Sequence, residues 1–142
     1  MLSASVEVRV RYGETDKMGI VYHPNYLTWF EIARIELLDS IGCPYSSLEE
    51  KNFFLPLLSC RIDFRRPAHF DDRLRIFVKI DQSSTLRIKA DYEVFRDIDL
   101  LAVGETTHAF VSGEGKVVRP PQDFLECVRQ STQQTEQGFD AN

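Results

Sequence analysis

Residues 12–26, YGETDKMGIVYHPNY, hold the side chains whose types and spacing are best suited to chemistry. Two carboxylates, Glu14 and Asp16, precede a glycine, a short apolar run and His23. Pro24 then marks a predicted helix start, because proline is favoured in the first helical turn. A helix start presents unpaired backbone N–H groups that can polarise a carbonyl or hold an oxyanion. A carboxylate nearby can act as a nucleophile or as a general base on water.

The residues that follow predict one long helix from Pro24 to Ile41. Gly42 and Pro44 mark its end, because glycine suits the left-handed position past a helix and proline prevents continuation. The helix is apolar over more than one stripe, so most of its circumference must be covered by other elements. Its apolar residues are Tyr26, Leu27, Trp29, Phe30, Ile32, Ala33, Ile35, Leu37, Leu38 and Ile41.

Several other stretches alternate apolar and charged residues, as half-buried β-strands do. The alternation is clear within residues 6–10, 58–64, 74–80 and 86–94, and weaker within 101–111. A polar, solvent-exposed face on each strand favours an antiparallel sheet, since parallel sheets are apolar on both faces. We therefore predict an α+β fold in which a curved antiparallel sheet of about five strands wraps around the long helix. Short helices are expected near residues 45–51 and 121–130.

One domain is predicted over residues 1–130, followed by a flexible polar tail at residues 131–142. No stretch approaches the roughly 20 apolar residues of a membrane span, and the N-terminus lacks a signal-peptide pattern. Cys43, Cys60 and Cys127 have no metal or redox spacing, so we expect reduced thiols, a cytoplasmic location and neither metal nor cofactor. Seventeen Lys and Arg residues against 22 Asp and Glu residues give a net charge of −5, which argues against nucleic-acid binding.

The run D-x-x-G-I-V-Y-x-P-N-Y, from Asp16 to Tyr26, resembles the signature of the 4-hydroxybenzoyl-CoA thioesterase family. The longer pattern YxETDxMGIVYHPNYLxWFExxR and the run RRPAHFDDRL at residues 65–74 are similar to its YbgC-like branch of short-chain acyl-CoA thioesterases. The resemblance covers about residues 5–130. It implies the hotdog fold, a curved sheet around one long helix, and hydrolysis of an acyl-CoA thioester to the free acid and CoA.

The same resemblance implies roles for individual residues. Asp16 is the expected catalytic carboxylate, acting as nucleophile or general base, with the thioester carbonyl against backbone N–H groups near His23. The His23 side chain is expected to orient Asp16 or a water molecule. Residues expected to contact the substrate are Tyr12, Gly19, Tyr22 and Tyr26.

The resemblance also implies active sites between subunits, and hence a homodimer or homotetramer. An arginine pair that holds CoA phosphates in the hydroxybenzoyl branch is replaced here by Asp81-Gln82, followed by two serines. Phosphate contacts would then come from elsewhere, and the acyl carrier is either CoA or an acyl-carrier protein. Candidate cations are Arg61, Arg65, Arg66 and Lys89.

Two other functions fit the sequence: a hydratase or dehydratase of the same fold, and a non-catalytic protein that binds acyl thioesters. In another thioesterase branch the catalytic carboxylate lies on the long helix, which would make Glu31 or Glu36 the base. Glu14 is expected to be a solvated loop residue, and His69 and His108 are expected to have structural roles.

Overall fold

The structure, a computed structural model, describes residues 2–81 and 86–140, with side chains up to residue 132. The strands are β1 (Leu2–Arg9), β2 (Phe53–Phe54), β3 (Leu57–Phe64), β4 (Arg73–Asp81), β5 (Ile88–Arg96), β6 (Asp99–His108) and β7 (Val111–Ser112). The helices are α1 (Asn25–Ser40), α2 (Tyr45–Glu50) and α3 (Gln122–Asp140), preceded by a short 3-10 helix, η1 (Tyr12–Glu14).

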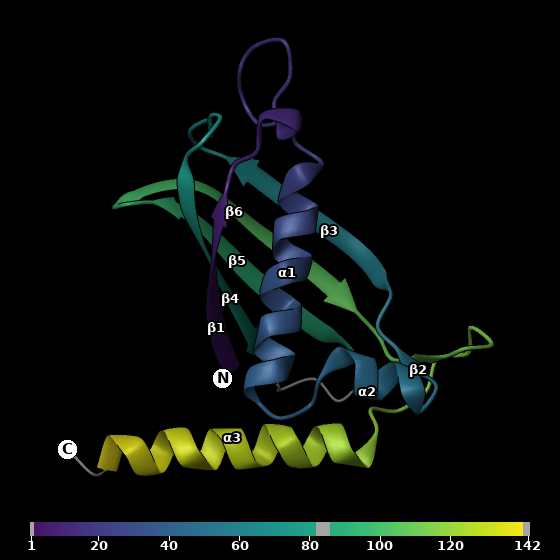
Figure 1. Cartoon of the computed structure of the whole chain (residues 1–142). Coiled ribbons are helices and arrows are strands. Elements are labelled where there is room, and N and C mark those ends of the chain that lie inside the picture. The colour runs from purple at the N-terminus through teal and green to yellow at the C-terminus, as the bar shows by residue number, and fades with distance from the viewer. Residues whose placement is uncertain (1, 82–85, 141–142) are drawn as a thin grey trace.

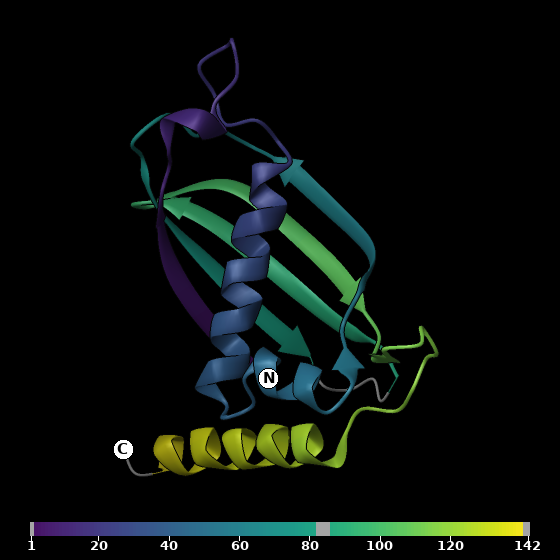
Figure 2. The same ribbon diagram turned by 45° about the vertical axis from the view of Figure 1, so that its right-hand side comes forward.

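Five strands form one antiparallel sheet in the order β1-β4-β5-β6-β3. Figures 1 and 2 show the sheet curving behind α1, which runs across its inner face. The predicted sheet around one long helix is therefore confirmed. The small β2–β7 sheet was not predicted, because paired strands of two residues are too short to show alternation.

The core lies between α1 and the inner face of the sheet. The Phe30 ring stacks on the Tyr92 ring, with centroids 4.1 Å apart and planes 10° from parallel. Gly104 on β6 makes room for this stack, because a Cβ there would lie 2.5 Å from the Phe30 ring. The inward-facing side chains of the strands and of α1 thus pack together in one aromatic layer.

The helix is less completely covered than its apolar composition predicts. Ile32 and Ile35 on α1 remain 43% and 38% exposed. On the edge strand β3, Cys60 is exposed, Ile62 is only partly covered, and Phe64 is half exposed. These positions pair with inward-facing residues of β6, so they continue the inner face of the sheet beyond the reach of α1. Within a single chain, an apolar strip along β3 and α1 stays open.

Helix α3 lies across the end of α1 opposite the η1 end (Figure 1). It buries Phe124 and Val128 and extends to Asp140, whereas the sequence predicted a helix near 121–130 and a tail at 131–142. Glutamine and glutamate are good helix formers, so a polar stretch can continue a helix that packing has already nucleated. No helix within the described residues is long and apolar enough to cross a membrane.

Candidate active site

The loop of residues 15–22 projects beyond the N-terminal end of α1 (Figure 1). Thr15 and Val21 pair as an antiparallel bridge at its base. Within it, the Asp16 N–H donates to the Ile20 carbonyl at 2.9 Å, and the Gly19 N–H donates to the Asp16 carbonyl at 2.9 Å. Gly19 has φ +80°, a left-handed conformation that glycine adopts without strain. Gly19 therefore shapes the turn that carries Asp16.

The Asp16 carboxylate is held by the turn at one oxygen only. Its Oδ1 accepts a hydrogen bond from the Met18 N–H at 2.9 Å. The described residues provide no hydrogen bond to Oδ2, and the side chain is solvent-accessible. A carboxylate fixed at one oxygen keeps the other available to a substrate carbon or a water molecule.

The loop is anchored to the β3–β4 connection as well as to its own base. Ile20 pairs with His69 as an antiparallel bridge, and the Val21 N–H donates to the Ala68 carbonyl at 2.9 Å. These bonds bring the loop beside the residues that follow β3. The predicted structural role of His69 stays a prediction, although its backbone takes part in this anchor.

The start of α1 offers one free amide rather than a row of them. The N–H groups of Asn25, Tyr26 and Leu27 donate back to the carbonyls of residues 22, 23 and 24, at 3.0, 3.2 and 3.1 Å. Pro24 has no N–H. Among the described residues, the His23 N–H has no acceptor. The helix dipole adds partial positive charge at this donor, so it is suited to a carbonyl oxygen.

Asp16 and His23 line the same open groove, whose volume is about 480 Å³. Its buried wall includes Tyr26, whose ring packs edge-on against Phe64 with centroids 5.0 Å apart. Burial raises the pKa of the Tyr26 phenol above its ordinary value. The lining residues are Asp16, Met18, Ile20, Val21, His23, Tyr26, Phe64, Arg65, Arg66 and Pro67.

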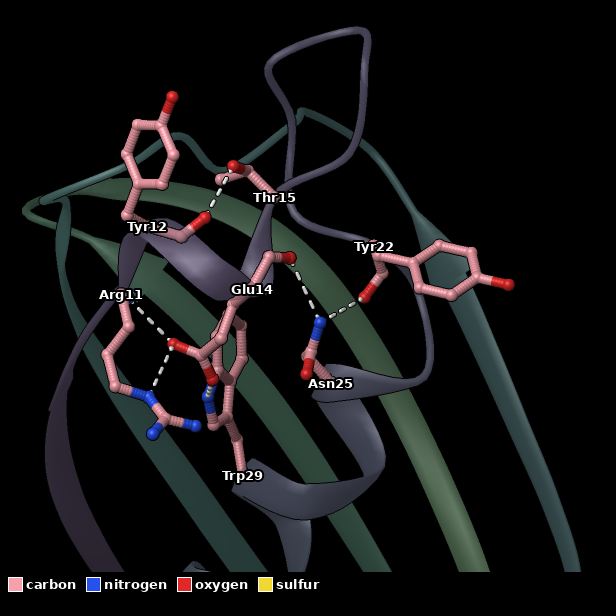
Figure 3. A network of polar contacts seen from close by, with 7 residues as sticks. All are labelled: Arg11, Tyr12, Glu14, Thr15, Tyr22, Asn25 and Trp29. Atoms are coloured by element: carbon pink, nitrogen blue, oxygen red, sulfur yellow. Dashed lines mark hydrogen bonds and ion pairs between the residues drawn. The ribbon is translucent and has the colours of Figure 1, made fainter.

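Two tyrosines that the sequence placed at the substrate do not line this groove. Tyr12 is 77% exposed and packs edge-on against Phe70, with centroids 5.4 Å apart. The Tyr22 ring is 52% exposed and packs against the His23 ring at 4.8 Å. Figure 3 shows both tyrosine rings pointing away from the polar network beneath the loop. A single chain therefore brings Asp16, His23 and Tyr26 together and leaves these two rings outside.

Two of the four candidate cations lie in the groove. Arg66 forms an ion pair with Asp99 at 3.3 Å, whereas the described residues supply no acidic partner for Arg65. Arg61 and Lys89 pair with acidic residues of the sheet and do not line this groove. Gln82 and the two serines after it lie outside the described residues. Arg65 is thus the cation beside Asp16 that is free for an anionic ligand.

Glu14 is buried, so the expectation of a solvated loop residue was wrong. Its side chain is surrounded by N–H donors, which Figure 3 shows between Arg11 and Trp29. Its Oε1 accepts from the Arg11 N–H at 2.7 Å, and its Oε2 accepts from the Trp29 Nε1–H at 3.2 Å. No clear sequence signal pointed to this burial, because the N-cap of η1 is Arg11 and not the Ser or Thr of a capping box.

A second cavity, of about 300 Å³, lies further along α1 and contains Glu31, Arg34 and His108. His108 Nε2 lies 2.9 Å from the Thr106 hydroxyl, and burial together with the Arg34 charge lowers the pKa of His108 to about 4. Glu31, the alternative base, lines this cavity and not the groove of Asp16. The two candidate carboxylates, Asp16 and Glu31, therefore line different cavities.

Comparison with known proteins identifies the family of the chain. Residues 10–128 match the model of a thioesterase-like superfamily. The chain is 31% identical over 121 residues to the acyl-CoA thioesterase YbgC of Haemophilus influenzae, covering 84% of this chain and 89% of that one. It is 32% identical over 133 residues to a 1,4-dihydroxy-2-naphthoyl-CoA hydrolase of Synechocystis, covering 86% and 91%. The crystal structure of a DHNA-CoA thioesterase from Staphylococcus aureus superposes with a TM-score of 0.87 at 26% identity, covering 97% and 96%.

Proposed function

The chain belongs to the thioesterase-like superfamily and is a thioester hydrolase, and we propose that Asp16 and the His23 backbone N–H are its catalytic groups. One observation supports the proposal: Asp16 and His23 line one groove, and the described residues give neither the Asp16 Oδ2 nor the His23 N–H a hydrogen-bond partner. Among the lining residues of that groove, Asp16 is the one that carries a carboxylate.

The His23 N–H would polarise the thioester carbonyl and stabilise the oxyanion that forms when its carbon is attacked. Removing one such donor typically costs about 100- to 1000-fold in rate. The donor needs no reorientation, because Pro24 and the first turn of α1 fix the backbone on its helix side. The imidazole of His23, packed against Tyr22, would orient Asp16 or a water molecule from the same side of the groove.

Asp16 has two routes to the same products. As a nucleophile, its free oxygen bonds to the thioester carbon, the C–S bond breaks, and the departing thiolate takes a proton from solvent. Water then cleaves the mixed anhydride and regenerates the carboxylate. As a general base, Asp16 takes a proton from a water molecule that attacks the same carbon, and the thiol leaves with that proton.

The proposed substrate is an acyl-CoA. The Haemophilus and Synechocystis relatives are both named for CoA thioesters. Arg65 supports this choice, because it lines the groove, has no acidic partner among the described residues, and is suited to a phosphate oxygen. An acyl-carrier protein presents one phosphate on its prosthetic group, fewer than CoA does, so it would make fewer phosphate contacts with Arg65.

We further propose that the working unit is a homodimer joined along β3. This edge strand exposes Leu57, Leu58 and Phe64, whereas the other edge, β1, ends in alternating polar residues. A second copy paired there would cover the open strip of β3 and α1 and remove an exposed apolar edge. Phe64 belongs both to this edge and to the Asp16 groove, so the partner would complete the groove.

The test of the activity is release of free thiol from a panel of acyl-CoA substrates, short-chain and aromatic, followed with a thiol-reactive dye. Hydrolysis of at least one class is expected. Enoyl-CoA hydration is measured in parallel, because hydration without thiol release would indicate a hydratase. Binding without either reaction would indicate a non-catalytic acyl-thioester-binding protein.

A further inference from the structure

The buried Glu14 carboxylate links the segment that follows β1 to helix α1. Its Oε1 accepts from the Arg11 N–H, where β1 has ended, and its Oε2 accepts from the Trp29 indole on α1. The Arg11 guanidinium approaches the same Oε1 at 3.5 Å from the exposed side. Each polar partner that the described residues give this carboxylate is therefore a donor, and the side chain joins the end of β1 to the second turn of α1.

The backbone of the same residue holds the other side of the loop. The Glu14 carbonyl accepts from the Tyr22 N–H at 2.8 Å and from the Asn25 Nδ2–H at 3.0 Å. Asn25 also donates to the Tyr22 carbonyl at 3.0 Å (Figure 3). Residue 14 thus fixes the chain two positions before Asp16 and, through Tyr22, the chain one position before His23.

We propose that Glu14 is a positioning residue that sets the distance between the Asp16 carboxylate and the His23 N–H, a role that rests on the proposed catalytic function of those two groups. Glu14 does not line the groove, so it does not touch the substrate. Its carboxylate joins the end of β1 to α1, and its backbone carbonyl holds the loop at Tyr22, so residue 14 connects all three.

The geometry predicts that glutamine is a poor replacement for Glu14. Both oxygens of the carboxylate receive N–H donors, whereas a glutamine amide has one acceptor oxygen and one NH₂ group. Whichever way the amide turns, its NH₂ faces either the Arg11 N–H or the Trp29 indole N–H. Two N–H donors then oppose each other in a buried or part-buried place, and we expect the loop to shift to separate them. A displacement of about 1 Å between catalytic groups typically costs about 100-fold in rate.

The test is a double-variant cycle with Glu14→Gln and Trp29→Phe, measured by kcat and KM on the best acyl-CoA substrate. Glu14→Gln is expected to lower kcat about 100-fold and to leave KM within about threefold. Trp29→Phe removes the donor that the new amide would face. The double variant is therefore expected to match Trp29→Phe alone, so that the loss due to Glu14→Gln largely disappears. Glu7→Gln, an exposed carboxylate on β1, is the control and keeps the parental kcat.

Amide hydrogen exchange supplies a readout that needs no activity. Glu14→Gln is expected to speed exchange of the Tyr22 amide about tenfold, as the loss of roughly one hydrogen bond implies. Parental exchange in Glu14→Gln, or additive losses of kcat in the double variant, would overturn the positioning role. If the parent protein hydrolyses no acyl-CoA, the proposed function fails, and the exchange measurement still decides whether Glu14 fixes the loop.

Discussion

The buried imidazole of His108 makes the stability of the protein depend on pH in a way that can be calculated. His108 is 2% exposed, and burial together with the nearby Arg34 charge lowers its pKa from 6.5 to about 4. Between these two values the unfolded chain binds a proton that the folded chain does not. The contribution of the neutral His108 to stability is therefore fully present above about pH 6.5 and is lost as the pH falls toward 4.

The size of the effect follows from the same two values. Each unit of pKa difference is worth about 1.4 kcal/mol, so the shift from 6.5 to about 4 corresponds to about 3 kcal/mol between pH 7 and pH 4. That is a large part of the total stability of a small domain. A His108→Gln variant removes this titration while keeping a side chain that can reach the Thr106 hydroxyl.

The assay is urea unfolding of parent and variant, followed by Trp29 fluorescence at several pH values from 7 to 4. Subtracting the two curves cancels the titration of other groups, such as Asp71, whose pKa Arg9 lowers through a side-chain hydrogen bond. We expect the parent to lose about 3 kcal/mol more than the variant over this range. Parallel curves would mean that His108 does not titrate as its surroundings indicate.

Three further predictions concern the core, the groove and the β3 edge. Gly104→Ala should lower the free energy of unfolding by about 1–3 kcal/mol, because the new methyl group would overlap the Phe30 ring, as thermal unfolding would detect. Arg65→Gln should raise KM for acyl-CoA about tenfold and leave KM for a pantetheine thioester without phosphates unchanged. Arg61→Gln, at an arginine outside the groove, is the control. An equal effect of Arg65→Gln on both substrates would exclude phosphate binding by Arg65. The parent should sediment as a dimer or tetramer and Leu58→Asp as a monomer; a monomeric parent would contradict pairing along β3.

The sequence carried enough information for the fold, because the strands and the helix each bury one set of side chains at their own period. The pairing of Val78 with Tyr92 and of Ala90 with Thr106 follows from that alternation. The extent of α3 was not predictable in this way. Its last turns are polar, and their helical conformation depends on residues such as Phe124 that dock the first turns.

Some residues of the candidate site could likewise be predicted from the sequence, and others could not. Asp16 and His23 stand in a local motif, so sequence alone pointed to them. The burial of Glu14 depends on Trp29, 15 residues later and on another element, and no local pattern encodes that contact. The placement of Arg65 in the groove likewise follows from the bond between Val21 and Ala68, which joins two distant segments.

The most direct test of the catalytic assignment compares Asp16→Asn with Glu31→Gln by kcat/KM for thiol release. Each substitution replaces one carboxylate by its amide of the same shape, one in the groove of the His23 amide and one in the second cavity. Asp16→Asn should lose activity by roughly a thousandfold with unchanged thermal stability, while Glu31→Gln stays within about threefold of the parent. Parental activity in Asp16→Asn, or the larger loss in Glu31→Gln, would contradict the assignment.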